Sequence, residues 1–266
     1  MNTHKDNAAF QALVARLQAA NASRPPTPAR LRRRPNRFFD LLQDDPAPPS
    51  QPIKDWRLKG VVTAVKQQGD CGSCGSFATS AAIETLLRIR DPNDTTDVDA
   101  GFMHTCTVLG AESDCRTSAD LQPVLDAVCA NGYAAACGQI LYPYPANRCG
   151  GVALRPVNHY IELGGNNAVK NALMLGPIVA EIYAWPDFTK YHGQTAFYSP
   201  DGNGDWYQHS VCVVGFNSNG WIIKNSFGPT WGVGGFVVIA YGTCGLFGGA
   251  PAGELPGQLF SLSLPA

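Results

Sequence analysis

The spacing of apolar residues changes along the chain from a helical to a strand-like pattern. Residues 74–89 are rich in Ala, Leu and Ile with few helix breakers, and Ser73 is a favourable N-cap, so a long buried helix is predicted there. From residue 178 onward, short apolar runs are separated by Gly and Asn, which is typical of strands joined by hairpins. We expect further helices over 119–130 and 167–175, and strands over 178–183, 210–216, 221–224 and 236–240.

The order of these elements indicates the fold class. Helices come first and antiparallel strands follow, which favours an α+β protein with two segregated lobes and a cleft between them. The first 50 residues differ from both lobes. A short helix is predicted from Phe10 to Ala19, and Pro-rich chain, the basic run 30–37 and the apolar cluster 38–42 follow it. Proline at this density favours extended chain, so this segment cannot bury a core by itself.

Composition excludes several classes of protein. The net charge of −1 gives no support for a bulk nucleic-acid binder. An apolar content of 45% is that of a globular chain, and no apolar run reaches the roughly 18 residues that span a bilayer. The N-terminal residues are polar and lack the apolar core of a signal peptide.

Nine cysteines are many for a cytosolic chain of this length, and their odd number leaves one thiol unpaired if the other eight form disulfides. Cys71 and Cys74 have the spacing of a zinc knuckle or of a redox motif. No second C-x-x-C or H-x₃-H pair follows them, however, and a redox motif requires a thioredoxin-like unit.

Cys74 is the candidate nucleophile. A thiol attacks as the thiolate, and both a helix N-terminus and a nearby imidazolium lower its pKa. Cys74 opens the long predicted helix, and His209 stands at the start of a predicted strand from which it can project into the cleft. Asn225 ends the next strand, where its amide oxygen can accept from the imidazole ring of His209. Taken singly, a lone His or Asn is more often structural.

Motifs in the same order along the chain together resemble the papain family of cysteine peptidases. Residues 67–74 resemble the family's nucleophile segment, and His and Asn follow at the family's separation of roughly 130–150 residues. Residues 55–66, 142–144, 187–198, 224–232 and 244–246 resemble further family segments. The resemblance covers about residues 53–250, and a bacterial member of the xylellain type is the suggested relative.

The sequence departs from the family pattern at three places. Gly75 stands where the family has Trp after the nucleophile, and Phe227 stands where it has Trp after Asn-Ser. Residues 115–118 read Cys-Arg-Thr-Ser where the family often has C-x-G-G, a segment whose backbone binds substrate. Substrate preference is therefore less well specified than mechanism.

The resemblance implies a mechanism and a set of site residues. Cys74, His209 and Asn225 would form the catalytic triad, and the Gln68 amide with the Cys74 N–H would bind the oxyanion. Phe227 and Trp231 would shield the His–Asn hydrogen bond. Tyr207, Gln208 and Gly249 would line the second specificity pocket and favour an uncharged apolar or aromatic side chain. No metal or other cofactor is expected.

The resemblance also implies disulfides and an oxidising compartment. Cys71–Cys115 and Cys106–Cys149 are expected from the family pattern, and Cys129–Cys137 from proximity across an Asn-Gly turn. Cys212 and Cys244 have no assigned partner. Such bridges indicate a secreted or extracytoplasmic protein, although no signal peptide is visible.

Residues 1–52 are interpreted as a short inhibitory pro-segment and 53–266 as the peptidase domain, with a helical lobe over about 53–155 and a β lobe over about 156–266. A disordered tail is the alternative for the first segment. We expect a monomer that acts on peptides or proteins, is inhibited by cystatin-like proteins, and binds neither nucleic acid nor membranes. Two alternatives stay open for the domain: an acyl transferase or deamidase that uses the same triad, and an inactive peptide-binding homologue.

Overall fold

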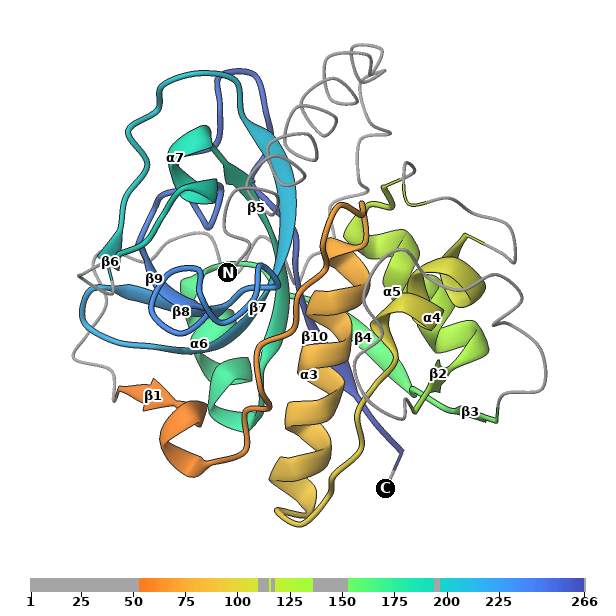
Figure 1. The fold of residues 1–266 in the computed structure, drawn as a ribbon. Coiled ribbons are helices and arrows are strands. Elements are labelled where there is room, and N and C mark those ends of the chain that lie inside the picture. Colours follow the sequence, from red (N-terminus) through yellow and green to blue (C-terminus); the bar gives the residue numbers. More distant parts are fainter. Residues whose placement is uncertain (1–52, 110–114, 116–117, 136–152, 194–196, 266) are drawn as a thin grey trace.

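The computed structural model describes residues 53–109, 115, 118–135, 153–193 and 197–265. Predictions on residues 1–52, including the helix from Phe10 and the apolar cluster 38–42, lie outside this part. In the described residues, a helical part and a mainly antiparallel sheet lie side by side, as the α+β prediction requires (Figure 1). No helix among them is long and apolar enough to cross a membrane.

The helical part is built around α3 (Cys74–Arg90). Thirteen of its 17 residues are buried, which explains why this helix is apolar on nearly all sides. Arg88 and Arg90 lie in its last turn, where positive charge is favourable to the helix dipole. Around α3 lie α4 (Ala100–Phe102), the π-helix η2 (Met103–Val108), α5 (Leu121–Asn131), and the strand pair β2 (Tyr133–Ala134) and β3 (Leu154–Arg155).

The sheet has eight strands in the order β4-β10-β5-β7-β8-β9-β6, with β1 also pairing with β7. All pairs are antiparallel except β6 with β9. The strands are β1 (Lys54–Asp55), β4 (His159–Glu162), β5 (Ile178–Ala184), β6 (Phe197–Tyr198), β7 (Tyr207–Phe216), β8 (Gly220–Lys224), β9 (Phe236–Ala240) and β10 (Leu259–Ser263). The same half of the chain holds α6 (Asn166–Leu175) and α7 (Pro186–Thr189), and the 3₁₀ helix η1 (Trp56–Lys59) follows β1.

Strand β7 lies between two hydrophobic cores. Val211 and Val213 belong to the core of the strand part, whereas Cys212 and Val214 belong to the core that α3 and α5 share with the sheet. Alternating side chains of one strand therefore serve both cores, as a period of two residues dictates. A β-bulge between Val213 and Gly215 lets β1 approach. A side chain at Gly215 would meet the Lys54 carbonyl oxygen at 2.1 Å, so only glycine fits there.

A buried polar network joins the helical part to β8. Glu84 of α3 accepts from the Thr63 hydroxyl and from Lys66, and also from the backbone N–H of Val98. Lys224 donates in turn to the Thr63 hydroxyl at 2.7 Å. Because Lys224 is the last residue of β8, this network holds the strand end from which Asn225 projects.

Every predicted helix and strand within the described residues is present, with ends shifted by no more than three residues. The helices η1, α4, η2 and α7 and the strands β1, β2, β3, β4, β6 and β10 were not predicted. Strand β4 exposes every second residue. The other unpredicted strands are short or show no alternation of buried and exposed residues, so pairing with neighbouring strands defines them more than their own sequence does.

The disulfide predictions have three different outcomes. Cys71–Cys115 is present, with a Cα–Cα distance of 4.6 Å. Cys106 is also disulfide-bonded, but Cys137 and Cys149 both lie outside the described residues. The Cys129–Cys137 prediction is wrong, because Cys129 is a free thiol. Its side chain packs against the core that α5 helps to form, and its thiol lies near the Asp126 carboxylate.

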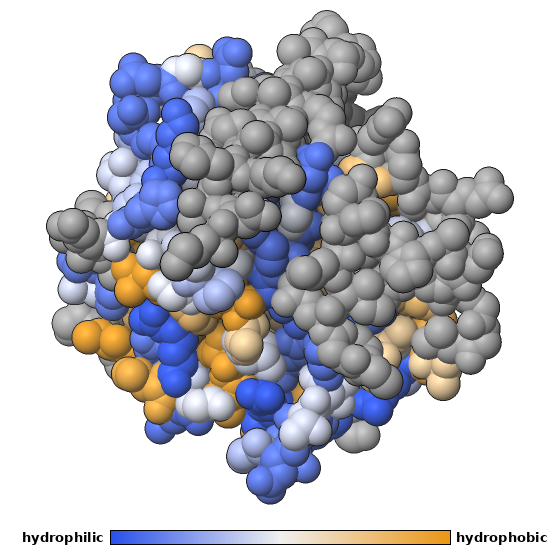
Figure 2. Space-filling view, viewed as in Figure 1, coloured by the Kyte–Doolittle hydropathy of each residue, from blue (hydrophilic) through white to orange (hydrophobic). Residues whose placement is uncertain are grey.

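The space-filling view shows hydrophilic residues in the middle of the displayed face, along the boundary between the strands and α3 (Figure 2). Large exposed hydrophobic residues include Ile53, Leu58 and Leu175. The boundary between the two parts is thus polar where it reaches this surface, and both parts bury their apolar residues in the cores behind it.

Candidate active site

Cys74 occupies the first position of α3 and is buried. Ser73 lies at the N-cap position, but its side chain makes no capping hydrogen bond. The N–H groups in the first turn of a helix have no backbone acceptor within the helix, so that of Cys74 is available to an anion. The Cys74 sulfur is hydrogen-bonded by the backbone and hydroxyl of Ser210 and by the N–H of Gly75.

The ionisation of Cys74 differs from the sequence-based expectation. Burial raises the pKa of the Cys74 thiol above its usual value and outweighs the hydrogen bonds from Ser210 and Gly75, which lower it. Burial also lowers the pKa of His209 to about 4, against a smaller opposing effect of its hydrogen bond to Asn225. Each group taken alone is therefore disfavoured in its charged form, and the helix N-terminus does not by itself lower the pKa of Cys74 below its usual value.

His209 and Asn225 are joined by a buried hydrogen bond. The distance from His209 Nε2 to Asn225 Oδ1 is 2.8 Å, and the two residues are 1% and 3% exposed. The bond fixes the ring tautomer, because Oδ1 can only accept and Nε2 must carry the proton. His209 Nδ1 is left without a hydrogen-bond partner and is the nitrogen that can take up a proton. It makes no hydrogen bond to Cys74, whose sulfur is held by the adjacent Ser210.

Aromatic rings cover this hydrogen bond. Phe227 stacks on the His209 ring with centroids 4.7 Å apart and an interplanar angle of 28°. Trp231 packs edge-on against Phe227 at 5.8 Å and is held by a hydrogen bond from its Nε1 to the Phe188 carbonyl. Of the two predicted shielding residues, Phe227 thus lies on the His209 ring, and Trp231 lies against Phe227.

Gln68 connects the nucleophile segment to the asparagine segment. Its Nε2 donates to the Cys71 carbonyl at 2.8 Å, and its Oε1 accepts from the Ser226 hydroxyl at 2.5 Å. Its backbone N–H donates to the Ser226 carbonyl. One N–H of the Gln68 amide is therefore used within the loop, and the second is available to a ligand.

Ser226 is a positioning residue that the sequence did not single out. It holds Gln68 through its hydroxyl and carbonyl, and its own N–H donates to Asn225 Oδ1 at 2.8 Å. A sequence signal existed, because Ser226 directly follows Asn225 in the segment that resembles the papain family.

Glu181 is a second residue near the nucleophile that was not predicted from the sequence. It lies on β5 opposite Ser210 in the β5–β7 register and is buried. Its carboxylate accepts from the N–H of Leu121, the first residue of α5. The negative charge of Glu181 contributes to the raised pKa of Cys74. A glutamate within an otherwise apolar strand was the available sequence signal.

Packing between α3 and α5 explains Gly75. A Cβ at this position would lie 3.0 Å from Val124 Cγ2 of α5 and 3.7 Å from the Ala119 carbonyl oxygen. The start of α5 therefore fills the space that a larger side chain after the nucleophile would need.

The predicted specificity residues are less closely grouped. Tyr207 is fully buried in the core of the strand part, with its ring centroid 6.3 Å from that of His209. Gln208 is half-buried and follows Tyr207 on β7, so its side chain lies on the opposite face of the strand. Gly249 is exposed, has a φ of 64° and lies against residues 242–244. The pocket that these three residues would form stays a prediction.

The comparisons with known proteins agree with the motifs. The family model described as "Papain family cysteine protease" matches residues 51–250. Cathepsin J of Mus musculus is 30% identical over 202 residues, which is 70% of this chain and 59% of the relative. Ananain of Ananas comosus is 28% identical over 237 residues, which is 82% of this chain and 65% of the relative. The chain thus spans about three fifths of the length of the curated relatives it matches.

Solved structures show the same fold. A cysteine protease of Carica candamarcensis, solved with E-64, aligns with a TM-score of 0.65 and 24% identity over 80% of this chain and 99% of that chain. The ragweed allergen Amb a 11, described as a cysteine protease in its proform, aligns with a TM-score of 0.62 and 21% identity over 100% of this chain and 90% of that chain. The predicted papain-like two-lobe fold is confirmed by these neighbours.

Proposed function

The chain belongs to the papain family of cysteine proteases, and we propose that it hydrolyses peptide bonds with Cys74 as nucleophile, His209 as acid and base, and Asn225 as the residue that orients His209. The observation that carries the proposal is the buried hydrogen bond from His209 Nε2 to Asn225 Oδ1, because it leaves Nδ1 as the free basic nitrogen. That histidine adjoins Ser210, whose backbone and hydroxyl contact the Cys74 sulfur.

Proton transfer within the pair activates the nucleophile. A buried thiolate or a buried imidazolium is unfavourable alone, as the two pKa shifts indicate. Transfer of the Cys74 proton to His209 Nδ1 creates both charges together, so each offsets the desolvation of the other. This transfer requires the Cys74 sulfur to leave Ser210 and contact Nδ1, and catalytic hydrogen bonds of this kind often tighten only when substrate binds.

The thiolate then attacks the carbonyl carbon of the scissile bond. The developing oxyanion accepts from the Cys74 N–H and from the second N–H of the Gln68 amide, and each such donor is worth about 10²–10³ in rate. His209 gives its proton to the leaving amine, which leaves a thioester on Cys74. Neutral His209 next removes a proton from water, and the resulting attack releases the acid and the thiol.

Two measurements test this assignment together. An epoxide thiol inhibitor should label Cys74, as mapped by mass spectrometry, and Cys74→Ala should abolish turnover of a fluorogenic peptidyl amide. Cys129→Ala is the matched control, because it removes a half-buried free thiol on α5. Labelling of another cysteine, or more than a few per cent of wild-type turnover in Cys74→Ala, would refute the nucleophile assignment. Amine release without peptide cleavage would instead indicate an acyl transferase or deamidase.

We also propose that residues 1–52 inhibit the domain that follows. The support is the alignment of the whole chain with a protein described as a proform, together with the papain-family match that begins at residue 51. Deletion of residues 1–50 should raise the initial rate on a small peptide substrate, and the separate segment should inhibit in trans. Equal initial rates, with no lag from self-processing, would contradict this role.

The Cys71–Cys115 disulfide supports placing the protein in an oxidising, extracytoplasmic compartment. Peptides and proteins are the proposed substrates, cystatin-like proteins the proposed inhibitors, and a monomer the proposed form.

A further inference from the structure

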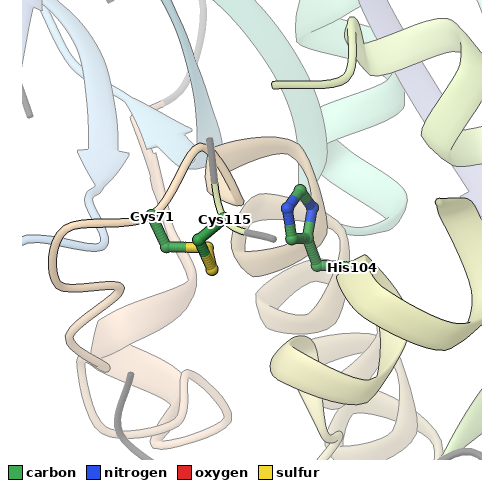
Figure 3. A group of neighbouring side chains, drawn as sticks. All are labelled: Cys71, His104 and Cys115. Atoms are coloured by element: carbon green, nitrogen blue, oxygen red, sulfur yellow. A yellow bond between two sulfur atoms is a disulfide. The ribbon is translucent and has the colours of Figure 1, made fainter. Parts of the chain in front are cut away.

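A buried histidine lies beside the disulfide that holds the nucleophile segment. Among the described residues, one group of three metal-ligating side chains lies together: Cys71, His104 and Cys115, all buried, with their donor atoms within 4.8 Å of one another. His104 comes from the π-helix η2, and Figure 3 shows its ring beside the disulfide, with one ring nitrogen on the side of the two sulfurs.

The histidine has an unmet hydrogen-bonding requirement. His104 is 1% exposed, and its Nε2 has no hydrogen-bond partner. An unpaired buried polar atom is destabilising, so an unpartnered nitrogen next to two sulfurs requires an explanation. In the disulfide form the two sulfurs are not metal ligands, because a metal binds the sulfur of cysteine as the thiolate.

We propose that reduction of the Cys71–Cys115 disulfide converts this group into a Zn²⁺ site formed by Cys71, Cys115 and His104. A thiol reductant supplies two electrons and two protons to the disulfide and is itself oxidised to a disulfide. Binding of Zn²⁺ then displaces the two thiol protons as both sulfurs become thiolate ligands. His104 Nε2 supplies the third ligand, and a fourth coordination position remains.

The distances suit zinc after a small adjustment. At Zn–S of about 2.3 Å and Zn–N of about 2.0–2.1 Å, two ligand atoms in a tetrahedral site lie about 3.6–3.8 Å apart. The three donors, already within 4.8 Å of one another, reach this spacing by side-chain rotation once the bond between the sulfurs is broken. Two thiolates and one imidazole form a donor set that zinc prefers.

The site would couple redox state to the proposed active site. Cys71 lies three residues before Cys74, and its carbonyl accepts the Gln68 amide at 2.8 Å. The N–H of the intervening Gly72 donates to the Cys115 carbonyl at 3.0 Å. Zinc bound to both cysteines would keep residues 71 and 115 together in the reduced protein, a role that the disulfide has in the oxidised protein.

Zinc binding by the full chain tests the proposal. Cys74 is first blocked with an epoxide inhibitor, or replaced in Cys74→Ala if no inhibitor reacts, so the measurement does not depend on peptidase activity. The protein is reduced with a phosphine, which is oxidised to its oxide with oxygen from water, and the phosphine is then removed. Zn²⁺ affinity and stoichiometry are measured by competition with a chromophoric chelator, and Co²⁺ spectra report thiolate ligation.

The expected result is one tightly bound Zn²⁺ per reduced chain and none at this affinity in the oxidised chain. His104→Gln should weaken binding at least about tenfold. His159→Gln, which changes an exposed histidine of β4, and Cys106→Ser, which removes another disulfide-bonded cysteine, should not.

Three binding results would overturn the proposal: no zinc binding by the reduced chain, equal effects of His104→Gln and His159→Gln on zinc affinity, or loss of zinc binding in Cys106→Ser. A near-UV circular dichroism spectrum showing that the reduced chain is unfolded both with and without zinc would also overturn it. If His104→Gln does not fold, His104→Asn and Cys115→Ser replace it, and full retention of zinc by both would equally refute the site.

Discussion

Removal of the Asn225 side chain should slow the enzyme far less than removal of His209. In Asn225→Ala the His209 ring keeps its basic Nδ1 but loses the acceptor that holds Nε2, 2.8 Å away in a site almost closed to water. His209→Ala removes the proton acceptor and donor altogether. Orientation and proton transfer can therefore be separated by comparing the two variants.

The size of the Asn225 effect can be worked from this bond. A hydrogen bond to a group that becomes charged is worth about 1.5–3 kcal/mol, and each 1.36 kcal/mol in the barrier is about tenfold in rate. Asn225→Ala should thus lower kcat/KM by roughly 10- to 150-fold. His209→Ala should lower it by about 10⁴-fold or more, as the loss of an essential member of a triad does.

The assay is kcat/KM for a fluorogenic peptidyl amide, measured across pH on freshly purified protein. Asn225→Asp should recover part of the loss, because a carboxylate also accepts from Nε2, and it should raise the pKa of His209 by adding a negative charge. A merely structural defect would not shift the pH profile. Asn217→Ala is the matched control, since Asn217 is a turn residue whose side chain caps Asn219 and Gly220.

Equal losses in Asn225→Ala and His209→Ala, with both proteins folded by near-UV circular dichroism, would refute the division of roles. An Asn225→Ala variant with wild-type kcat/KM would show that the shielding rings alone hold His209. Phe227 is the ring in question, because it stacks directly on the imidazole.

Three further predictions follow from burial and packing. Glu181→Gln should lower the Cys74 pKa while keeping an acceptor for the Leu121 N–H, and an unchanged pH midpoint for iodoacetamide alkylation would contradict this. The pKa values of His104 and His209 in the folded protein are about 4, below the unfolded value of 6.5, so the unfolded chain binds more protons between these pH values. Each histidine should therefore lower the free energy of unfolding by about 3 kcal/mol as the pH falls from 6.5 to below 4. Urea unfolding of Cys74→Ala at pH 7 and pH 4 measures that loss, and equal midpoints would refute it. Gly75→Trp should destabilise the fold by at least about 1–3 kcal/mol, with partial rescue by Val124→Ala, because α5 fills the space beside Gly75.

Local sequence patterns were sufficient to predict the elements that carry the candidate triad. The apolar run of α3 and the hairpin of β7 and β8 are specified by their own residues, so the positions of Cys74, His209 and Asn225 on those elements follow. Motif spacing then connects elements that are far apart in the chain. The sequence was therefore sufficient to predict which residues of distant elements belong to one site.

Residues whose role depends on a distant partner could not be found in this way. Ser226 matters because it holds Gln68, which lies 158 residues earlier, and Gly75 matters because α5 packs on it. The Cys129–Cys137 prediction failed for a related reason. Closeness in sequence gave no information on which way the Cys129 side chain turns once α5 packs on the core.

The state of Cys74 shows why a local rule can identify a residue and still misjudge its chemistry. The rule that a helix N-terminus lowers a thiol pKa is correct for the contribution of the Gly75 N–H, which has that sign here. The same fold, however, buries Cys74, the first residue of α3, against Ser210 of β7 and places the Glu181 carboxylate on the neighbouring strand, and both effects raise the pKa. Since burial also disfavours the His209 cation, the charged pair is favoured only when the two charges lie close enough to stabilise each other. The resting thiol should therefore react slowly with small alkylating agents that do not engage His209, and quickly with inhibitors that occupy the oxyanion position near Gln68.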